Sequence, residues 1–206
     1  MISGNTLSHD QWRSDEGDEE KSDSPKMPTD KFFATRTVLI FGQIDQKLAQ
    51  NVAAQLLYLD HLNNDPIKIL INSPGGHVES GDTIHDLIQY IASPVAVIGS
   101  GWVASAGTHI FLGAAKERRF CLPNTRFLIH QPAGGMQGKA VEIEIAAREI
   151  ARMRERLAQV IAERTGQPVE RVSKDIERDY WMTTSEAIDY GILGKVINTA
   201  KDVTFT

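Results

Sequence analysis

Short apolar segments alternate with amphipathic segments along the middle of this chain, and this alternation constrains the fold more than any other feature. Segments typical of buried strands lie at 37–42, 68–73, 94–100, 118–122 and 126–130. After the first of them, apolar residues recur at helical spacing, at Leu48, Val52, Leu56 and Leu59. This rhythm predicts an α/β fold with crossover connections and strands that are buried on both faces.

A longer helical segment follows at about 137–165. Its apolar residues recur at positions 143, 146, 150, 153, 157 and 160, and Gly138 is its only glycine before the helix would end. At a rise of 1.5 Å per residue, about 27 residues would make a helix roughly 40 Å long, which exceeds the width of a small domain. We expect this apolar stripe to pack against another subunit; a helix contained in its own core is the alternative.

The net negative charge of this 206-residue chain, -5, lies entirely in its N-terminal segment. Residues 1–30 hold eight acidic and three basic residues, whereas the remainder holds nineteen of each. This segment has too few aliphatic residues to offset the entropy of ordering, so we expect an acidic, disordered tail, with an acidic docking segment as the alternative. Residues 31–206 are assigned to a single domain. No basic patch is available for nucleic acid.

Cysteine content and hydropathy limit the other classes of site. Cys121 is the only cysteine, so the chain cannot form an internal disulfide and has no CxxC spacing for a metal. We expect no metal site. The sequence has no apolar run long enough to cross a membrane and no secretory signal pattern at its N-terminus, so we expect a cytoplasmic protein without a membrane partner.

Two residues have positions that suit nucleophilic catalysis. Ser105 lies among small residues in GWVASAGTHI (101–110), where a strand pattern changes to helical spacing. The start of a helix directs free N–H groups towards a neighbouring group, although such a serine is also a common helix cap. His130 ends the segment RFLIH, where a strand terminus can present a side chain to a cleft. A structural, hydrogen-bonded histidine is the alternative there.

The remaining parts of a catalytic site are less determined by the pattern. The turn Pro74-Gly75-Gly76 follows a strand segment, and a turn without side chains would let a substrate backbone or an oxyanion approach closely. A carboxylate that orients the base cannot be selected by spacing. The candidates are Asp175, Glu177, Asp179 and Asp189.

Four segments of the sequence together resemble the ClpP family, the proteolytic subunits of Clp proteases. They are NSPGGHVESG from Asn72, GSGWVASAGTHI from Gly99, AKERRFCLPNTRFLIHQPAGGMQG from Ala115 and ERDYWMTTSEAIDYGILGKVI from Glu177. The resemblance extends over about residues 36–198. It implies the fold of ClpP and crotonases, a superhelix of repeated β-β-α units with a long protruding handle helix at about 137–165.

The resemblance also implies a serine endopeptidase and the role of each residue in it. Ser105 would be the nucleophile, His130 the general base and Asp179 the residue that orients the imidazole. The backbone amides of Gly76 and Ala106 would form the oxyanion hole.

Assembly is a further implication of the family. Two heptameric rings would stack into a tetradecamer, composed of this chain alone or mixed with a second ClpP, with Glu177 and Arg178 at the interface between rings. Unfolded polypeptides would be supplied by a hexameric AAA+ unfoldase of the ClpX or ClpA type. That partner would bind ATP, because this sequence has no GxxxxGK[ST] loop. The chain itself would need no cofactor.

Three residues depart from the family pattern beside the nucleophile and the glycine turn. Trp102 stands where glutamine is common, Ala106 where methionine is common and His77 where a small residue is common. We expect these departures to alter the pocket for the substrate side chain, as in a divergent paralogue. A regulatory ring subunit with low activity of its own is the alternative function, and an acyl-CoA enzyme of the crotonase type is a third hypothesis.

Overall fold

The computed structural model describes residues 34–135 and 137–205 of the chain. Its helices and strands alternate as the sequence predicts, and the acidic segment 1–30 lies outside the described residues. The elements are β1 (Thr37–Ile44), α2 (Gln46–Leu62), β2 (Ile67–Gly76), α3 (Val78–Tyr90), β3 (Val95–Ala104), α4 (Ala106–Phe111), η1 (Lys116–Arg118), β4 (Arg119–Cys121), β5 (Arg126–Ile129), α5 (Ala140–Thr165), α6 (Val169–Asp175), β6 (Tyr180–Met182), α7 (Thr184–Tyr190), β7 (Lys195–Val196) and η2 (Ala200–Asp202).

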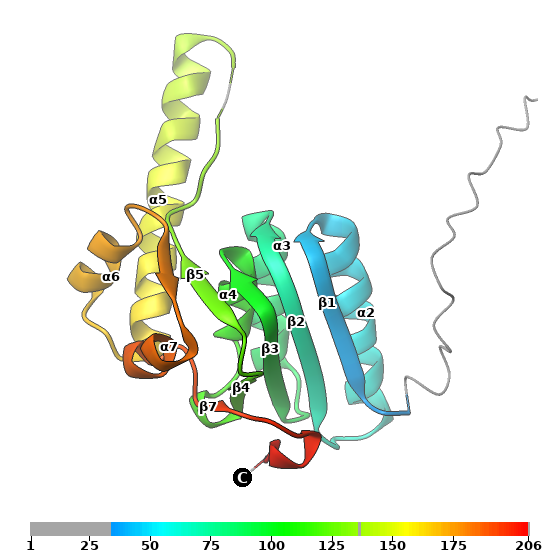
Figure 1. Cartoon of the computed structure of the whole chain (residues 1–206). Helices are drawn as coiled ribbons and strands as arrows, with labels where there is room; N and C mark the ends of the chain where they lie inside the picture. Colours follow the sequence, from blue (N-terminus) through cyan, green and yellow to red (C-terminus); the bar gives the residue numbers. More distant parts are fainter. Residues whose placement is uncertain (1–33, 136, 206) are drawn as a thin grey trace, which may run out of the picture.

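The strands form one seven-stranded sheet (Figure 1). Its main path runs β1-β2-β3-β4-β7, and β3 is long enough to pair with β4 along one half and with β5 along the other. These pairs are parallel, whereas β6 joins β5 in antiparallel orientation. The α/β class is therefore as expected, and the carboxyl ends of β2, β3 and β5 lie together at one edge of the sheet.

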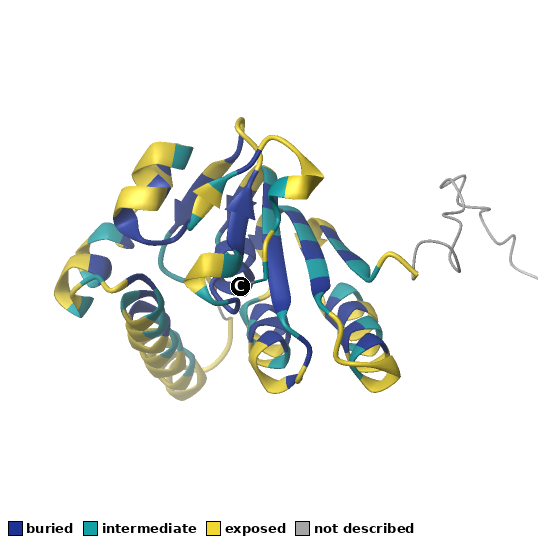
Figure 2. Ribbon diagram, turned by 90° about the horizontal axis from the view of Figure 1, so that it is seen from below, coloured by how far each residue is buried: buried dark blue, intermediate teal, exposed yellow. Residues whose placement is uncertain are grey.

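Helices α2 and α3 cover one face of the sheet (Figure 2). Residues that point to this face, such as Val38, Ile40 and Ile69, are fully buried. The alternate residues of β1 and β2 remain partly or fully exposed, so the expectation of strands buried on both faces is wrong for these two. The reason is that no helix covers their second face in the described chain.

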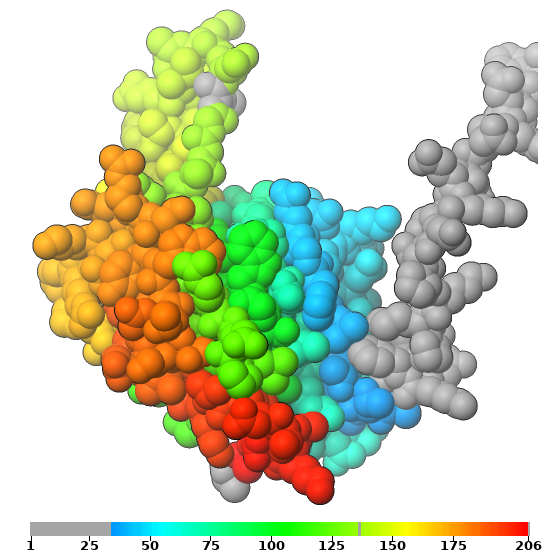
Figure 3. Space-filling view, in the orientation of Figure 1, coloured from blue at the N-terminus to red at the C-terminus, as the bar shows by residue number. Residues whose placement is uncertain are grey.

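The C-terminal segment covers the second face farther along the sheet. Val203 and Phe205 pack against a small cluster formed by Ala96, Phe120 and Ile197. In the space-filling view this segment, coloured red, lies across the lower part of the molecule (Figure 3). The early residues of β3 are consequently buried on both sides.

Helix α5 is the expected handle, and it projects beyond the sheet (Figure 1). It begins at Ala140, slightly later than the predicted 137, because Gly138 disfavours helix and the Lys139 N–H donates to the Glu142 side chain at 2.9 Å. Only its second half is buried, at Leu157, Ala158, Ile161 and Thr165. The apolar side chains Val141, Ile143 and Ile145 are exposed at its free end.

Candidate active site

Ser105 lies at the junction of β3 and α4 in a strained backbone conformation. Its φ of 57° and ψ of -121° place it in a region that residues with side chains rarely occupy. The side chain makes no capping hydrogen bond to α4, so the alternative of a simple helix cap is wrong. Strain of this kind is retained where the surrounding structure needs it, commonly at functional sites.

The glycine turn packs directly against this serine. A Cβ atom on Gly75 would lie 2.6 Å from the Ser105 Cβ and 2.8 Å from the Ala104 carbonyl oxygen, and the φ of Gly75 is +99°. The Gly75 N–H donates to the Ser73 Oγ at 3.0 Å, and this hydrogen bond stabilises the turn. Only glycine therefore allows β2 to end this close to Ser105.

Strand pairing brings the other two predicted residues to the same place. The Ser105 N–H donates to the Leu128 carbonyl at 3.0 Å, which sets the serine beside the end of β5, where His130 follows. In the antiparallel pair β5–β6, Ile129 is opposite Tyr180. The next residues outward are His130 and Asp179, so the sheet register places them face to face.

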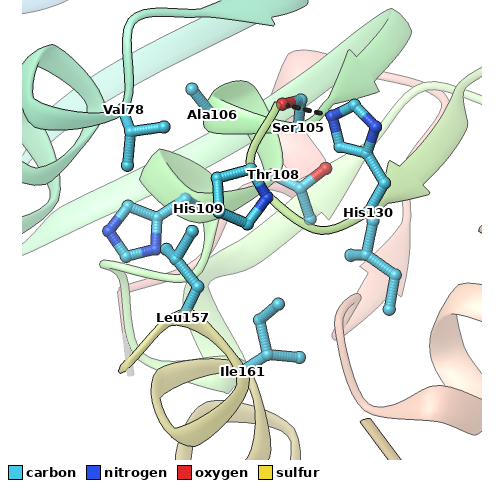
Figure 4. Close-up of a pocket in the computed structure, with 10 residues that line it drawn as sticks. Val78, Ser105, Ala106, Thr108, His109, His130, Leu157 and Ile161 are labelled. Carbon is cyan, nitrogen blue, oxygen red and sulfur yellow. Dashed lines mark hydrogen bonds between the residues drawn. The ribbon is translucent and has the colours of Figure 1, made fainter. Parts of the chain in front are cut away.

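The three side chains form a continuous hydrogen-bonded chain. The His130 Nε2 lies 2.8 Å from the Ser105 Oγ (Figure 4), and its Nδ1 lies 3.1 Å from the Asp179 Oδ1. The Ser105 hydroxyl donates to Nε2 when Nδ1–H donates to the carboxylate. The His130 side chain is 28% exposed and that of Asp179 is 63% exposed, so solvent and a substrate can reach this site.

Two of the other candidate carboxylates have different partners. Asp175 accepts from the Tyr190 hydroxyl at 3.0 Å, and Glu177 lies 3.5 Å from the Arg154 guanidinium. The ambiguity that spacing left open is thus resolved by geometry, since Asp179 is the carboxylate in contact with His130.

A pocket opens beside the Ser105 hydroxyl, between α4, the end of β5 and α5 (Figure 4). The empty space between its walls is about 430 Å³ when the solvent at its mouth is included, but only about 30 Å³ of it can hold the centre of a water molecule. Its walls are mainly apolar, and the polar groups besides Ser105 and His130 belong to Thr108 and His109. The lining residues are Val78, Ser105, Ala106, Thr108, His109, Ile129, His130, Pro132, Leu157 and Ile161.

A charged cluster behind this pocket was not predicted from the sequence. The His109 Nε2 lies 2.9 Å from the Asp82 Oδ1, and the Arg156 guanidinium holds both Asp82 oxygens at 2.9 and 2.7 Å. Burial alone would raise the pKa of Asp82, but the hydrogen bonds and charges of His109 and Arg156 lower it below its usual range. The ring of His85 stacks on His109 at 4.4 Å.

The spacing of Ser105 and His109 was the signal that could have revealed part of this cluster. Residues four apart on a helix share a face, so His109 had to lie one turn along the helix from Ser105. His85, which lies on α3, is only 5% exposed. Burial and the neighbouring His109 both lower its pKa.

The structure also bears on metal binding and on membrane insertion. No group of three or more His, Cys, Asp or Glu side chains is arranged to hold a metal ion within 34–135 and 137–205. Over the same residues, no helix is long and apolar enough to span a membrane.

Comparison with known proteins identifies the family. The family model described as Clp protease matches residues 20–200. The chain belongs to the Clp protease family. It is 50% identical over 192 residues to the ATP-dependent Clp protease proteolytic subunit 3 of Rhizobium etli, covering 90% of this chain and 99% of that one. It is 55% identical over 166 residues to the proteolytic subunit of Paracoccus denitrificans, covering 81% and 83%.

Solved structures of Clp protease subunits agree with the fold. A point mutant of ClpP1 from Listeria monocytogenes matches with a TM-score of 0.81 and 56% identity, covering 86% of this chain and all of that one. Unmutated ClpP1 from the same organism gives a TM-score of 0.79 and 53% identity, with coverage of 86% and 100%. The ClpP-type fold expected from the sequence is confirmed.

Of the three departures from the Clp protease pattern, only Ala106 lines the pocket beside Ser105. The His77 side chain turns away, with its Nδ1 2.9 Å from the Ser80 Oγ and its Nε2 3.2 Å from Glu79. Trp102 pairs with Arg126 in the sheet and is 42% exposed. The expected change in the substrate pocket is therefore restricted to Ala106 among these three.

Glu177 and Arg178, the residues expected at the interface between rings, are both exposed. Glu177 is also tied to its own chain, because its carbonyl accepts from the Gln131 side chain at 3.0 Å and its carboxylate pairs with Arg154 on α5. The segment that carries Asp179 is thus attached to both β5 and the handle.

Proposed function

We propose that this chain is the proteolytic subunit of a Clp protease, a serine endopeptidase that cleaves unfolded polypeptides through an acyl-enzyme. The observation that carries this proposal is the hydrogen-bonded series from Ser105 through His130 to Asp179, at 2.8 and 3.1 Å. A nucleophile, a base and a group that orients the base are the parts that acyl transfer requires.

The geometry supports a definite sequence of proton movements. The Ser105 Oγ attacks the carbonyl carbon of the substrate while its proton passes to the His130 Nε2. The resulting imidazolium is stabilised by Asp179 at Nδ1, and it then donates the proton to the leaving amine as the peptide C–N bond breaks. A water molecule subsequently attacks the acyl-enzyme with His130 again as the base, which releases the second product and restores Ser105.

The oxyanion would be held by the backbone amides of Gly76 and Ala106. Ala106 is the first residue of α4, so its N–H has no acceptor within the helix. A Cβ on Gly75 would lie 3.1 Å from that nitrogen, which shows how closely the glycine turn approaches it. Donors that are fixed by backbone geometry before the reaction begins need no reorganisation in the transition state.

Assembly and partners follow from the family as parts of the same proposal. We propose stacked heptameric rings forming a tetradecamer, with α5 as the handle and with Glu177 and Arg178 at the contact between rings. The exposed apolar end of α5 supports such a contact. A hexameric AAA+ unfoldase would supply the substrate and use the ATP, so this chain would need no cofactor, and its location would be cytoplasmic.

The test is the intact mass of the purified protein after reaction with a fluorophosphonate, beside a Ser105→Ala control. We expect a single adduct on the unaltered chain and none on Ser105→Ala, because only a hydroxyl activated by its base reacts readily with this reagent. Sedimentation of both proteins shows whether the substitution has changed their assembly.

Absence of the adduct from an assembled protein would contradict an active peptidase and would favour the regulatory ring subunit. Binding of acyl-CoA would instead support the crotonase-type activity. A crotonase-type activity would not explain the hydrogen bonds that join Ser105, His130 and Asp179.

A further inference from the structure

His109 forms part of the pocket beside Ser105, although the peptidase chemistry makes no use of it. It lies one turn along α4 from Ser105 and is only 6% exposed. Its Nδ1 has no hydrogen-bond partner among the described residues, and its Nε2 lies 2.9 Å from the Asp82 Oδ1. A buried polar atom in this state calls for a partner.

The orientation of the His109 ring is fixed from two sides. The ring of His85 stacks on it with an interplanar angle of 13°. The Asp82 carboxylate, itself held by Arg156, lies beside Nε2. A lone pair facing a carboxylate is unfavourable, so the proton belongs on Nε2, and Nδ1 is left with unused hydrogen-bonding capacity.

The free nitrogen lies on the side of the pocket. Figure 4 shows one ring nitrogen of His109 pointing away from Ser105 and the other on the side of Leu157, which also lines the pocket. Because Nε2 is the atom in contact with Asp82, the atom on the Leu157 side is Nδ1. The surrounding walls are apolar, and a hydrogen bond formed there would not compete with bulk water.

We infer that His109 selects the side chain that enters this pocket, and that it favours an uncharged carboxamide of glutamine length. This inference rests on the proposed peptidase function, because the pocket then receives the side chain of the residue whose carbonyl Ser105 attacks. One helical turn, about 5.4 Å, separates the levels of Ser105 and His109. An extended glutamine side chain spans about this distance, whereas that of asparagine is shorter.

A carboxamide is favoured over a carboxylate or an alkyl group because of the hydrogen bonds that it can form with His109. It has both donors and an acceptor, so it can pair with Nδ1 whether the ring is neutral, with a lone pair there, or charged, with an N–H there. A glutamate side chain would bring a second carboxylate into a pocket that already has Asp82 behind it. Norleucine, of nearly the same length, fills the pocket without making the bond.

Entry of such a side chain requires the Leu157 side chain to turn aside, because Nδ1 is covered in the unliganded chain. An unbranched side chain needs the smallest displacement. Length, a terminal amide and the absence of branching thus all point to glutamine.

The experiment compares two peptides as competing substrates of the assembled protein. They differ only at the residue whose carbonyl Ser105 attacks, which is glutamine in one and norleucine in the other. For the unaltered chain we expect cleavage of both, with the higher kcat/KM for glutamine. His109→Phe preserves the ring and the stacking on His85 but removes Nδ1, so the ratio of glutamine to norleucine should fall about fivefold to tenfold, the usual worth of one hydrogen bond between uncharged groups.

The matched control is His85→Phe, which makes the same change in the other ring of the stacked pair. His85 does not line the pocket, so this variant should keep the ratio of the unaltered chain even if the stacked pair is destabilised. The inference of glutamine selection by His109 is overturned if the glutamine to norleucine ratio is unchanged in His109→Phe, or if it falls equally in both variants. In either case, cleavage of the norleucine peptide would still support the peptidase function. Failure of the unaltered chain to cleave either peptide would contradict the proposed function itself, and the selectivity with it.

Discussion

The ion pair between Asp82 and Arg156 offers a quantitative test of how burial strengthens a charge contact in this fold. It joins α3 to α5 through two hydrogen bonds of 2.9 and 2.7 Å. The Asp82 side chain is 19% exposed and that of Arg156 is 47% exposed. Removing one partner of a fully buried pair costs about 3–5 kcal/mol, whereas exposed pairs contribute about 0.2–1 kcal/mol. The half-exposed arginine places this pair between them, at a coupling energy of about 2 kcal/mol.

The assay is a double-mutant cycle of Asp82→Asn and Arg156→Gln, with the free energy of unfolding measured by denaturant at one protomer concentration. The matched control is the pair Glu144 and Arg148, which has a similar distance of 3.0 Å but side chains that are 67% and 65% exposed. We expect a coupling of about 0.3–0.5 kcal/mol for that control. Equal couplings in the two cycles would refute the argument from burial.

The same pair predicts a pH dependence with a definite sign. The pKa of Asp82 is lower in the folded chain than in the unfolded chain, because the contributions of His109 and Arg156 exceed the opposing effect of burial. Its stabilisation is therefore present above the unfolded pKa of about 3.9 and is lost as the pH falls through the folded pKa. The difference in unfolding free energy between the unaltered chain and Asp82→Asn should accordingly shrink below about pH 4.

Two substitutions and one labelling experiment test other parts of the structure. Gly75→Ala should lower peptide cleavage by at least about a hundredfold, because the new Cβ would collide with the Ser105 Cβ at 2.6 Å and displace the nucleophile; cleavage at the unaltered rate would contradict the packing described for the turn. Asp179→Asn should lower the rate by about 10⁴, as in the best-studied triad, and sedimentation must show intact rings for this loss to be assigned to the site. Burial raises the pKa of the Cys121 thiol to about 11, so iodoacetamide should label it only as fast as the chain unfolds; labelling under native conditions would reveal local opening of β4.

The order of the helices and strands could be predicted because it depends on local patterns. Apolar runs and helical spacing gave the strands and helices of the first half, and the glycine turn appeared where β2 ends at Gly76. The prediction that β1 and β2 are buried on both faces was wrong, because the residue pattern of a strand does not show what covers its second face. That depends on where the C-terminal segment lies, at β3 and β4 and not at β1.

The active site was predictable in part from the residues and in part from the resemblance. Ser105 and His130 occupy positions that sequence reasoning could single out, but the choice of Asp179 among four carboxylates depended on the register of a strand of three residues. The cluster behind the pocket could not be predicted, because Asp82, His109 and Arg156 come from three helices whose packing no local pattern describes.

The position of Asp179 depends on a short strand and on the segment that precedes it. It precedes β6, which is held to β5 by only three residue pairs. A slip of one residue in that register would turn the carboxylate to the opposite face of the sheet. The segment before it is fixed by the Gln131 N–H, which donates to the Ile176 carbonyl at 2.7 Å, and by the pairing of Glu177 with Arg154 on α5. Arg154 lies on α5, whose free end exposes Val141, Ile143 and Ile145, so an ion pair joins the segment that carries Asp179 to the handle helix.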